Sequence, residues 1–190
     1  MQALAAQLGG PLPEGDRAPL TVIGHSLGSV IASDFMWDST RGADQPYHFR
    51  DYPFTVKNIV LMGSPMALYA LRNKPGASES DIINALDCPV QVDPDGGLWL
   101  NLYDPQDPIA FPLHPIRAYA ETGVIDHVVR AGSWLASLTP LSHVGYWTCR
   151  DTAEVIGRKL ALDWAALNAP GFDRARYEQA LAAFRKDIQS

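Results

Sequence analysis

The chain has 190 residues, of which 47% are hydrophobic and 19% charged, and its formal net charge is −6. This balance predicts one globular domain over residues 1–190 with a sizeable core, and it argues against a largely disordered chain. The acidic charge excludes the clustered basic surface that a nucleic-acid partner requires, so we expect no such partner.

The sequence gives no sign of a targeting segment or of a metal motif. No apolar stretch of the sequence is long enough to span a bilayer, and MQALAAQLGG lacks the basic region and apolar core of a secretory signal, so we expect a cytoplasmic protein. In that compartment Cys88 and Cys149 are expected as two unpaired thiols. The five histidines show no metal-ligand spacing, and we expect no metal and no cofactor.

The first predicted elements are a helix, a loop and a strand. Apolar residues at helical spacing after Met1 predict a short helix that ends at Gly9, and GGPLPEGDRAP is typical of a loop. Leu20–Ile23 is a short apolar run with β-branched residues, which predicts a buried strand. Small residues follow Ser26 and suit a helix packed close to a sheet. Residues 20–37 are therefore expected to form a strand, a tight turn and a helix.

Three more strands are predicted downstream. Val56–Met62 is a second buried strand, GLWLNLYD a third that stops at DPQDP, and VIDHVV a fourth. A short helix is expected over Met66–Leu71. Strands that alternate with helices imply a mainly parallel sheet flanked by helices, in three α/β/α layers.

Two helices end the chain. The first is expected to begin with Asp151 as N-cap, because Glu154 follows three residues later. Its apolar residues share one face: Ile156, Leu160, Trp164 and Leu167. After the break NAPGFD, the last helix carries a second apolar stripe: Tyr177, Leu181, Phe184 and Ile188.

One pentapeptide stands at the predicted strand-to-helix turn. Residues 24–28, GHSLG, match G-x-S-x-G, the nucleophile elbow of the α/β-hydrolase fold. We expect glycine at positions 24 and 28 because side chains there would collide with the neighbouring strand and helix. A serine hydroxyl is a poor nucleophile without a base, so Ser26 needs partners elsewhere in the chain.

The order of residues along the chain suggests those partners. In this fold the acid and then the histidine follow the serine, the acid after a later strand. Asp104 and Asp107 both lie at the end of the third predicted strand, and His143 lies between the fourth strand and the next helix. Both aspartates fit the rule.

Two longer segments make the similarity more specific. GLWLNLYDPQDPIAFPL and GSWLASLTPLSHVGYW resemble the acid and histidine segments of a group of bacterial α/β-hydrolase-like proteins, and the resemblance runs over residues 20–147. It implies a serine hydrolase of carboxylic esters that forms an acyl-enzyme on Ser26, with His143 as base. The group's pattern implies Asp107 as the acid and Asp104 as a turn residue. It also implies that the backbone N–H of Leu27 belongs to the oxyanion hole.

The resemblance further implies several strands before the elbow, one of which supplies a second oxyanion-hole donor from its loop. This sequence has one predicted helix and a loop in that place, so we expect a truncated α/β-hydrolase fold. The Leu20–Ile23 strand would then lie at an open apolar edge, which a homo-oligomer or a missing N-terminal segment would complete. Two alternatives stay open: a non-catalytic binding or interaction module, and an inactive fragment of a longer hydrolase.

The remaining candidate residues have structural interpretations. His25 is expected to pack beside the elbow, and His114 to lie in a surface loop. His127 is expected to face either solvent or the covering helices. Ser64, in MGSP, follows a strand but lacks the second glycine of the elbow, and we expect it to line the site.

Overall fold

The computed structural model describes residues 18–40, 54–72, 92–132 and 140–189. Its strands are Ala18–His25 (β1), Phe54–Met62 (β2), Leu98–Tyr103 (β3) and Ile125–Val128 (β4). All three strand pairings are parallel, in the order β1-β2-β3-β4. The predicted α/β class and its four strands are confirmed, whereas the predicted helix after Met1 and the thiol of Cys88 lie outside the described residues.

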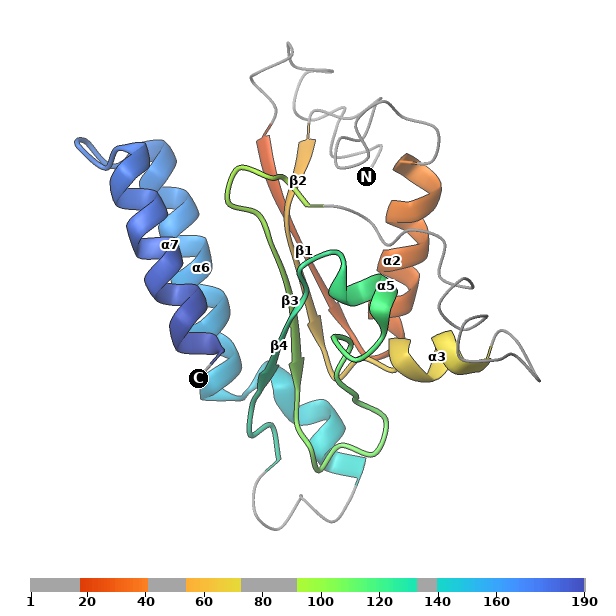
Figure 1. The fold of residues 1–190 in the computed structure, drawn as a ribbon. Helices are drawn as coiled ribbons and strands as arrows, with labels where there is room; N and C mark the ends of the chain where they lie inside the picture. The colour runs from red at the N-terminus through yellow and green to blue at the C-terminus, as the bar shows by residue number, and fades with distance from the viewer. Residues whose placement is uncertain (1–17, 41–53, 73–91, 133–139, 190) are drawn as a thin grey trace, which may run out of the picture.

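Helices cover both faces of this sheet. They are Leu27–Thr40 (α2), Met66–Arg72 (α3), Arg117–Ala120 (α5), the 3₁₀ helix Pro140–Trp147 (η1), Arg150–Asn168 (α6) and Arg174–Ile188 (α7). Figure 1 shows α6 and α7 together on one side of the sheet and α2, α3 and α5 on the other. Within the described ranges, no helix combines the length and apolar composition that a bilayer crossing needs.

The two central strands contribute side chains to two hydrophobic cores, one on each face of the sheet. Almost every residue of β2 and β3 is buried, as expected for parallel strands covered on both faces. Because side chains alternate along a strand, Ile59 and Leu61 join the core under α2 and α3, whereas Val60 and Met62 join the core under α6 and α7.

The first strand ends the sheet that the described residues form. β1 pairs with β2 on one side, and Ile23 remains 38% exposed. The helices on both faces also leave large apolar side chains exposed: Leu27, Ile31 and Phe35 on α2, and Leu160, Trp164 and Leu167 on α6. Within the described residues the Leu20–Ile23 strand thus lies at a sheet edge, as predicted. The prediction that it is buried is wrong, because Leu20, Thr21 and Val22 are only half-buried at this edge.

The helix α6 differs from its prediction in two respects. Its N-cap is Cys149, without a side-chain hydrogen bond, so the assignment of Asp151 was wrong: this residue lies in the first turn and is exposed. Its packed face is also not the apolar one, since the buried residues are Thr152, Val155, Lys159 and Asp163. The apolar stripe predicted for α7 is buried, which confirms that part of the prediction.

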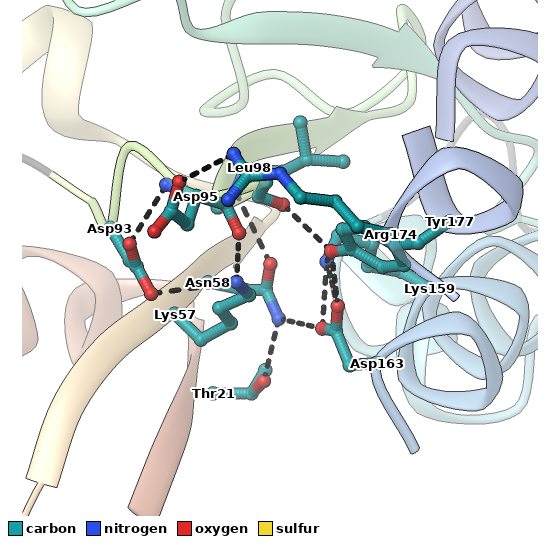
Figure 2. A network of polar contacts seen from close by, with 12 residues as sticks. Thr21, Lys57, Asn58, Asp93, Asp95, Leu98, Lys159, Asp163, Arg174 and Tyr177 are labelled. Atoms are coloured by element: carbon teal, nitrogen blue, oxygen red, sulfur yellow. Dashed lines mark hydrogen bonds and ion pairs between the residues drawn. The ribbon is translucent and has the colours of Figure 1, made fainter. Parts of the chain in front are cut away.

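A buried polar network joins α6 and α7 to the sheet (Figure 2). The Nζ atom of Lys159 lies 2.5 and 2.7 Å from the two carboxylate oxygens of Asp163. The same carboxylate accepts hydrogen bonds from Tyr177 Oη at 2.7 Å and from Asn58 Nδ2 at 2.8 Å. These additional donors satisfy the buried carboxylate, which is the condition for tolerating an ion pair in a protein interior.

Burial has a clear electrostatic effect on this network. It lowers the pKa of Lys159 to about 8, although the neighbouring Asp163 acts in the opposite direction. Burial also raises the pKa of Tyr177, and its hydrogen bond to Asp163 adds to that rise. The phenol therefore remains a neutral donor to Asp163.

Candidate active site

The turn at Ser26 is sharp. Ser26 separates the last residue of β1 from the first residue of α2, and its φ angle is 55°. It is the one non-glycine residue with positive φ in the described parts of the chain. A side chain in this left-handed region costs energy, so the surrounding structure must hold it there. One restraint is the hydrogen bond from Ser26 N to Met62 O, at 3.0 Å.

The two glycines of the pentapeptide are not equivalent. A Cβ atom at Gly24 would lie 2.7 Å from Ser29 Cα, so this position requires glycine as predicted. At Gly28 an added Cβ would meet nothing within 4 Å, and the predicted collision there is wrong. The reason is that Gly28 lies on the exposed side of the first turn of α2.

Two buried serines lie beneath the turn. Ser29 Oγ donates to the backbone oxygen of Ser26 at 2.6 Å and lies 2.7 Å from Ser64 Oγ. Because the Ser29 proton points to Ser26, the proton between the two hydroxyls comes from Ser64. Ser64 Oγ in turn accepts from Met66 N at 3.2 Å. Ser64 therefore supports the Ser26 turn from the interior and does not face the solvent side of the site.

The structure brings Ser26, His143 and Asp107 together. His143 Nε2 lies 2.6 Å from Ser26 Oγ, and His143 Nδ1 lies 2.7 Å from Asp107 Oδ2. The Asp107 side chain is fully buried, and that of His143 is 16% exposed. An ionised carboxylate only accepts, so the Nδ1 proton points to Asp107 and the lone pair of Nε2 faces the serine hydroxyl.

Each aspartate after β3 has its own partners. Asp104 accepts from Gln106 N at 2.9 Å and from Gly132 N at 3.1 Å, which makes it a turn residue. Asp107 Oδ1 accepts from Ile109 N at 3.1 Å, which leaves Oδ2 for His143. Of the two candidates, the structure places Asp107 against the imidazole.

Sequence reasoning missed Tyr146 as part of this arrangement. Its hydroxyl lies 3.1 Å from Asp107 Oδ2 and accepts from Asp104 N at 2.9 Å. Burial raises the pKa of Tyr146, and the charge of Asp107 adds to that rise, although the hydrogen bond from the Asp104 backbone opposes it. The sequence feature that could have indicated Tyr146 is its spacing, because it lies one helical turn after His143.

The other histidines take distinct positions. His25 Nε2 donates to the backbone oxygen of His143 at 2.6 Å, and the two rings lie 5.0 Å apart, so His25 packs beside the turn as predicted. His127 Nδ1 donates to Ile188 O at 2.7 Å, on the side of the covering helix α7. His114 is exposed in the loop after β3.

Three large apolar residues close to the site residues in the sequence are exposed. The residues next to Ser26 and His143 in sequence, Leu27 and Val144, are 48% and 58% exposed, and Trp147 is 64% exposed. The rings of Trp147 and His25 lie edge to face, at 5.9 Å between ring centroids. The backbone N–H of Leu27 begins α2, where helical N–H groups have no acceptor within the helix.

No family model matches the chain, and the searches of curated proteins and of solved structures also returned no match. No group of histidine, cysteine and carboxylate side chains in the described ranges is arranged to hold a metal ion. The arrangement offers a path for a proton from the hydroxyl of Ser26 to an imidazole that a buried carboxylate orients.

Proposed function

We propose that the chain is a serine hydrolase of carboxylic esters with an α/β-hydrolase type of fold. The observation that carries this proposal is the chain of hydrogen bonds from Ser26 Oγ to His143 Nε2 at 2.6 Å and from His143 Nδ1 to Asp107 Oδ2 at 2.7 Å. The positive φ of Ser26, at a turn between a strand and a helix, supports the same assignment.

The reaction proceeds by acyl transfer. Ser26 Oγ bonds to the ester carbonyl carbon while its proton passes to His143 Nε2, and the carbonyl electron pair moves to oxygen. The bond to the alcohol then breaks, and His143 returns the proton to that leaving group. Water attacks the acyl-Ser26 by the same route and releases the carboxylic acid. Throughout, Asp107 holds the imidazole tautomer and stabilises the imidazolium.

The negative oxygen formed during attack needs hydrogen-bond donors. The amide of Leu27 is the proposed donor, because it lies at the positive N-terminal end of α2 directly after the nucleophile. The second donor belongs beside β1, whose outer edge is unpaired within the described residues. An added parallel strand there would bring its carboxyl-end loop to the same end of the sheet as Ser26.

Within the described residues, the amide of Leu27 is the one proposed oxyanion-hole donor. Loss of one oxyanion-hole donor reduces turnover by about a hundredfold to a thousandfold. A single donor would give slow turnover, so accumulation of the acyl-enzyme is the more sensitive measurement.

The exposed side chains favour esters with an apolar acyl group. Leu27, Val144 and Trp147 offer an uncharged surface next to the proposed nucleophile and base. Contact with such a surface removes apolar area of both substrate and protein from water, which stabilises binding.

Mass spectrometry with an activated ester tests the proposal. Incubation with a p-nitrophenyl ester is expected to add one acyl group to Ser26 and none in Ser26→Ala. Asp107→Asn is expected to slow acylation by about a thousandfold or more, because the imidazole loses its tautomer. Asp104→Asn is the matched control, since its partners are backbone amides, and it should acylate within about tenfold of the wild type. A folded wild-type chain that gains no acyl group would favour the non-catalytic module.

A further inference from the structure

Tyr146 lies on the buried side of the proposed site, and its side chain is 1% exposed. Its hydroxyl has two neighbours: Asp104 N at 2.9 Å and Asp107 Oδ2 at 3.1 Å. A backbone N–H only donates, so it uses a lone pair of the phenol oxygen. The one hydroxyl proton is then directed to Asp107.

The carboxylate of Asp107 depends on that proton. Oδ2 accepts from His143 Nδ1 at 2.7 Å and from Tyr146, while Oδ1 accepts from Ile109 N at 3.1 Å. The side chain is fully buried, so a lost donor leaves a charged oxygen without water to replace it. Without the phenol, Asp107 Oδ2 has only His143 Nδ1 as a hydrogen-bond donor among the described residues. The imidazole would then have to hold the same carboxylate that orients it.

The backbone at the end of β2 makes room for this contact. A Cβ atom at Gly63 would lie 2.7 Å from Tyr146 Cε2 and 3.2 Å from both Asp107 Oδ2 and His143 Nδ1. Gly63 also has a positive φ of 57°, which favours glycine for a second reason. The Tyr146 ring and the Asp107–His143 pair thus lie close enough together to exclude any side chain at this position.

We infer that Tyr146 is a positioning residue of the proposed hydrolase: it holds Asp107 so that the carboxylate keeps the Nδ1 proton of His143 in place. The inference rests on the proposed function for its kinetic consequence. Its structural consequence, the protection of the Nδ1 proton, is measurable whether or not the chain hydrolyses an ester. Burial keeps the pKa of Tyr146 raised, so the phenol acts as a neutral donor.

The test compares Tyr146→Phe with Tyr177→Phe. Tyr177 is a matched control, since its hydroxyl is also buried and donates to a carboxylate, Asp163 Oδ1, at 2.7 Å in the network under α6 and α7. Proton NMR measures the exchange of the His143 Nδ1 proton with water, and its loss in His143→Gln assigns the signal. Acylation kinetics with a p-nitrophenyl ester, thermal unfolding and circular dichroism complete the comparison.

In Tyr146→Phe we expect exchange to be about tenfold faster and kcat about tenfold lower, with KM changed less than twofold, as for one lost bond to a charged group. Tyr177→Phe should lower thermal stability and leave exchange and kcat unchanged. Tyr146→3-fluorotyrosine keeps the donor and the ring, and it should retain wild-type exchange and kcat even if Tyr146→Phe fails to fold.

The outcomes separate this inference from the proposed function. A folded Tyr146→Phe with wild-type exchange and wild-type kcat would overturn the positioning role and leave the hydrolase proposal intact. Loss of both properties in the 3-fluorotyrosine variant would also overturn it. If the wild type forms no acyl-enzyme but Tyr146→Phe still exposes the Nδ1 proton, the hydrolase proposal fails and the role of Tyr146 toward Asp107 is supported.

Discussion

The Nε2 atom of His25 donates a 2.6 Å hydrogen bond to the backbone oxygen of His143, which lies 118 positions later in the chain. The residue before Ser26 therefore holds the backbone of the residue whose imidazole faces Ser26. The contact joins the end of β1 to η1, and the two rings pack at 5.0 Å. The position of His143 thus depends on His25 at its backbone and on Asp107 at its ring.

Replacement of His25 by phenylalanine tests this dependence. Phenylalanine keeps an aromatic ring against His143 but removes the donor, so we expect kcat/KM for a p-nitrophenyl ester to fall about three- to tenfold, as for one neutral hydrogen bond. His127→Phe is the control, because His127 also donates to a backbone oxygen, that of Ile188, on the α7 side of the sheet. Equal kcat/KM values in the two variants would count against a role for His25 in placing His143.

Alanine substitutions at two glycines with positive φ distinguish the cost of backbone strain from the cost of side-chain crowding. Gly63 has φ 57° and Gly123 has φ 73°, but an added Cβ meets Tyr146, Asp107 and His143 only at Gly63 and meets nothing within 4 Å at Gly123. Gly123→Ala should lower the free energy of unfolding by about 1 kcal/mol through strain alone. Gly63→Ala should lower it further, because the buried ring and carboxylate must move, and acylation of Ser26 should be lost. Urea unfolding measures both; the same destabilisation in both variants would contradict the crowding at Gly63.

The buried lysine of α6 predicts a pH dependence of stability. Its pKa is lowered by burial to about 8 from an ordinary value of 10.5. Between these values the unfolded chain binds a proton at Lys159 that the folded chain does not, so the free energy of unfolding gains a contribution that rises with pH. Below pH 8 both states carry the proton and this contribution is flat.

Urea unfolding from about pH 7 to 10 checks that slope. Lys159→Met should remove the rise, whereas Lys186→Met, at an exposed position of α7, should retain it. The upper limit comes from the tyrosines whose pKa burial raises, Tyr119, Tyr146 and Tyr177: the unfolded tyrosines lose their protons first, so stability falls again above about pH 10. An unchanged slope in Lys159→Met would contradict the depressed pKa of this lysine.

The elements and the three proposed site residues follow from local patterns. β2 and β3 are near-continuous apolar runs, which is how buried parallel strands read in a sequence. The GHSLG pentapeptide marks Ser26, and the order of elements marks His143 and a pair of aspartates. The order of elements leaves Asp104 and Asp107 equivalent, because both follow the same strand; the resemblance favours Asp107, and the 2.7 Å distance from His143 Nδ1 to Asp107 Oδ2 agrees with it.

Local sequence patterns could not predict the contacts between distant segments. Lys159 and Asp163 are spaced as an exposed helical ion pair, yet Asn58 and Tyr177 meet them in the interior. Leu160, Trp164 and Leu167 share one face of α6 in the sequence pattern, yet they are exposed, because α6 packs on the face that carries Lys159 and Asp163. Tyr146 had one local signal, its spacing from His143, but its bond to Asp107 exists only after folding.

The proposed hydrolase depends on the activation of Ser26 by His143. Its most direct test is the rate at which a fluorophosphonate reagent labels Ser26, followed by mass spectrometry on folded protein. We predict labelling of the wild type at Ser26, none in Ser26→Ala, and a rate at least about a hundredfold lower in His143→Gln, which lacks the base. A folded wild-type chain that stays unlabelled, or a His143→Gln variant labelled as fast as the wild type, would contradict this activation.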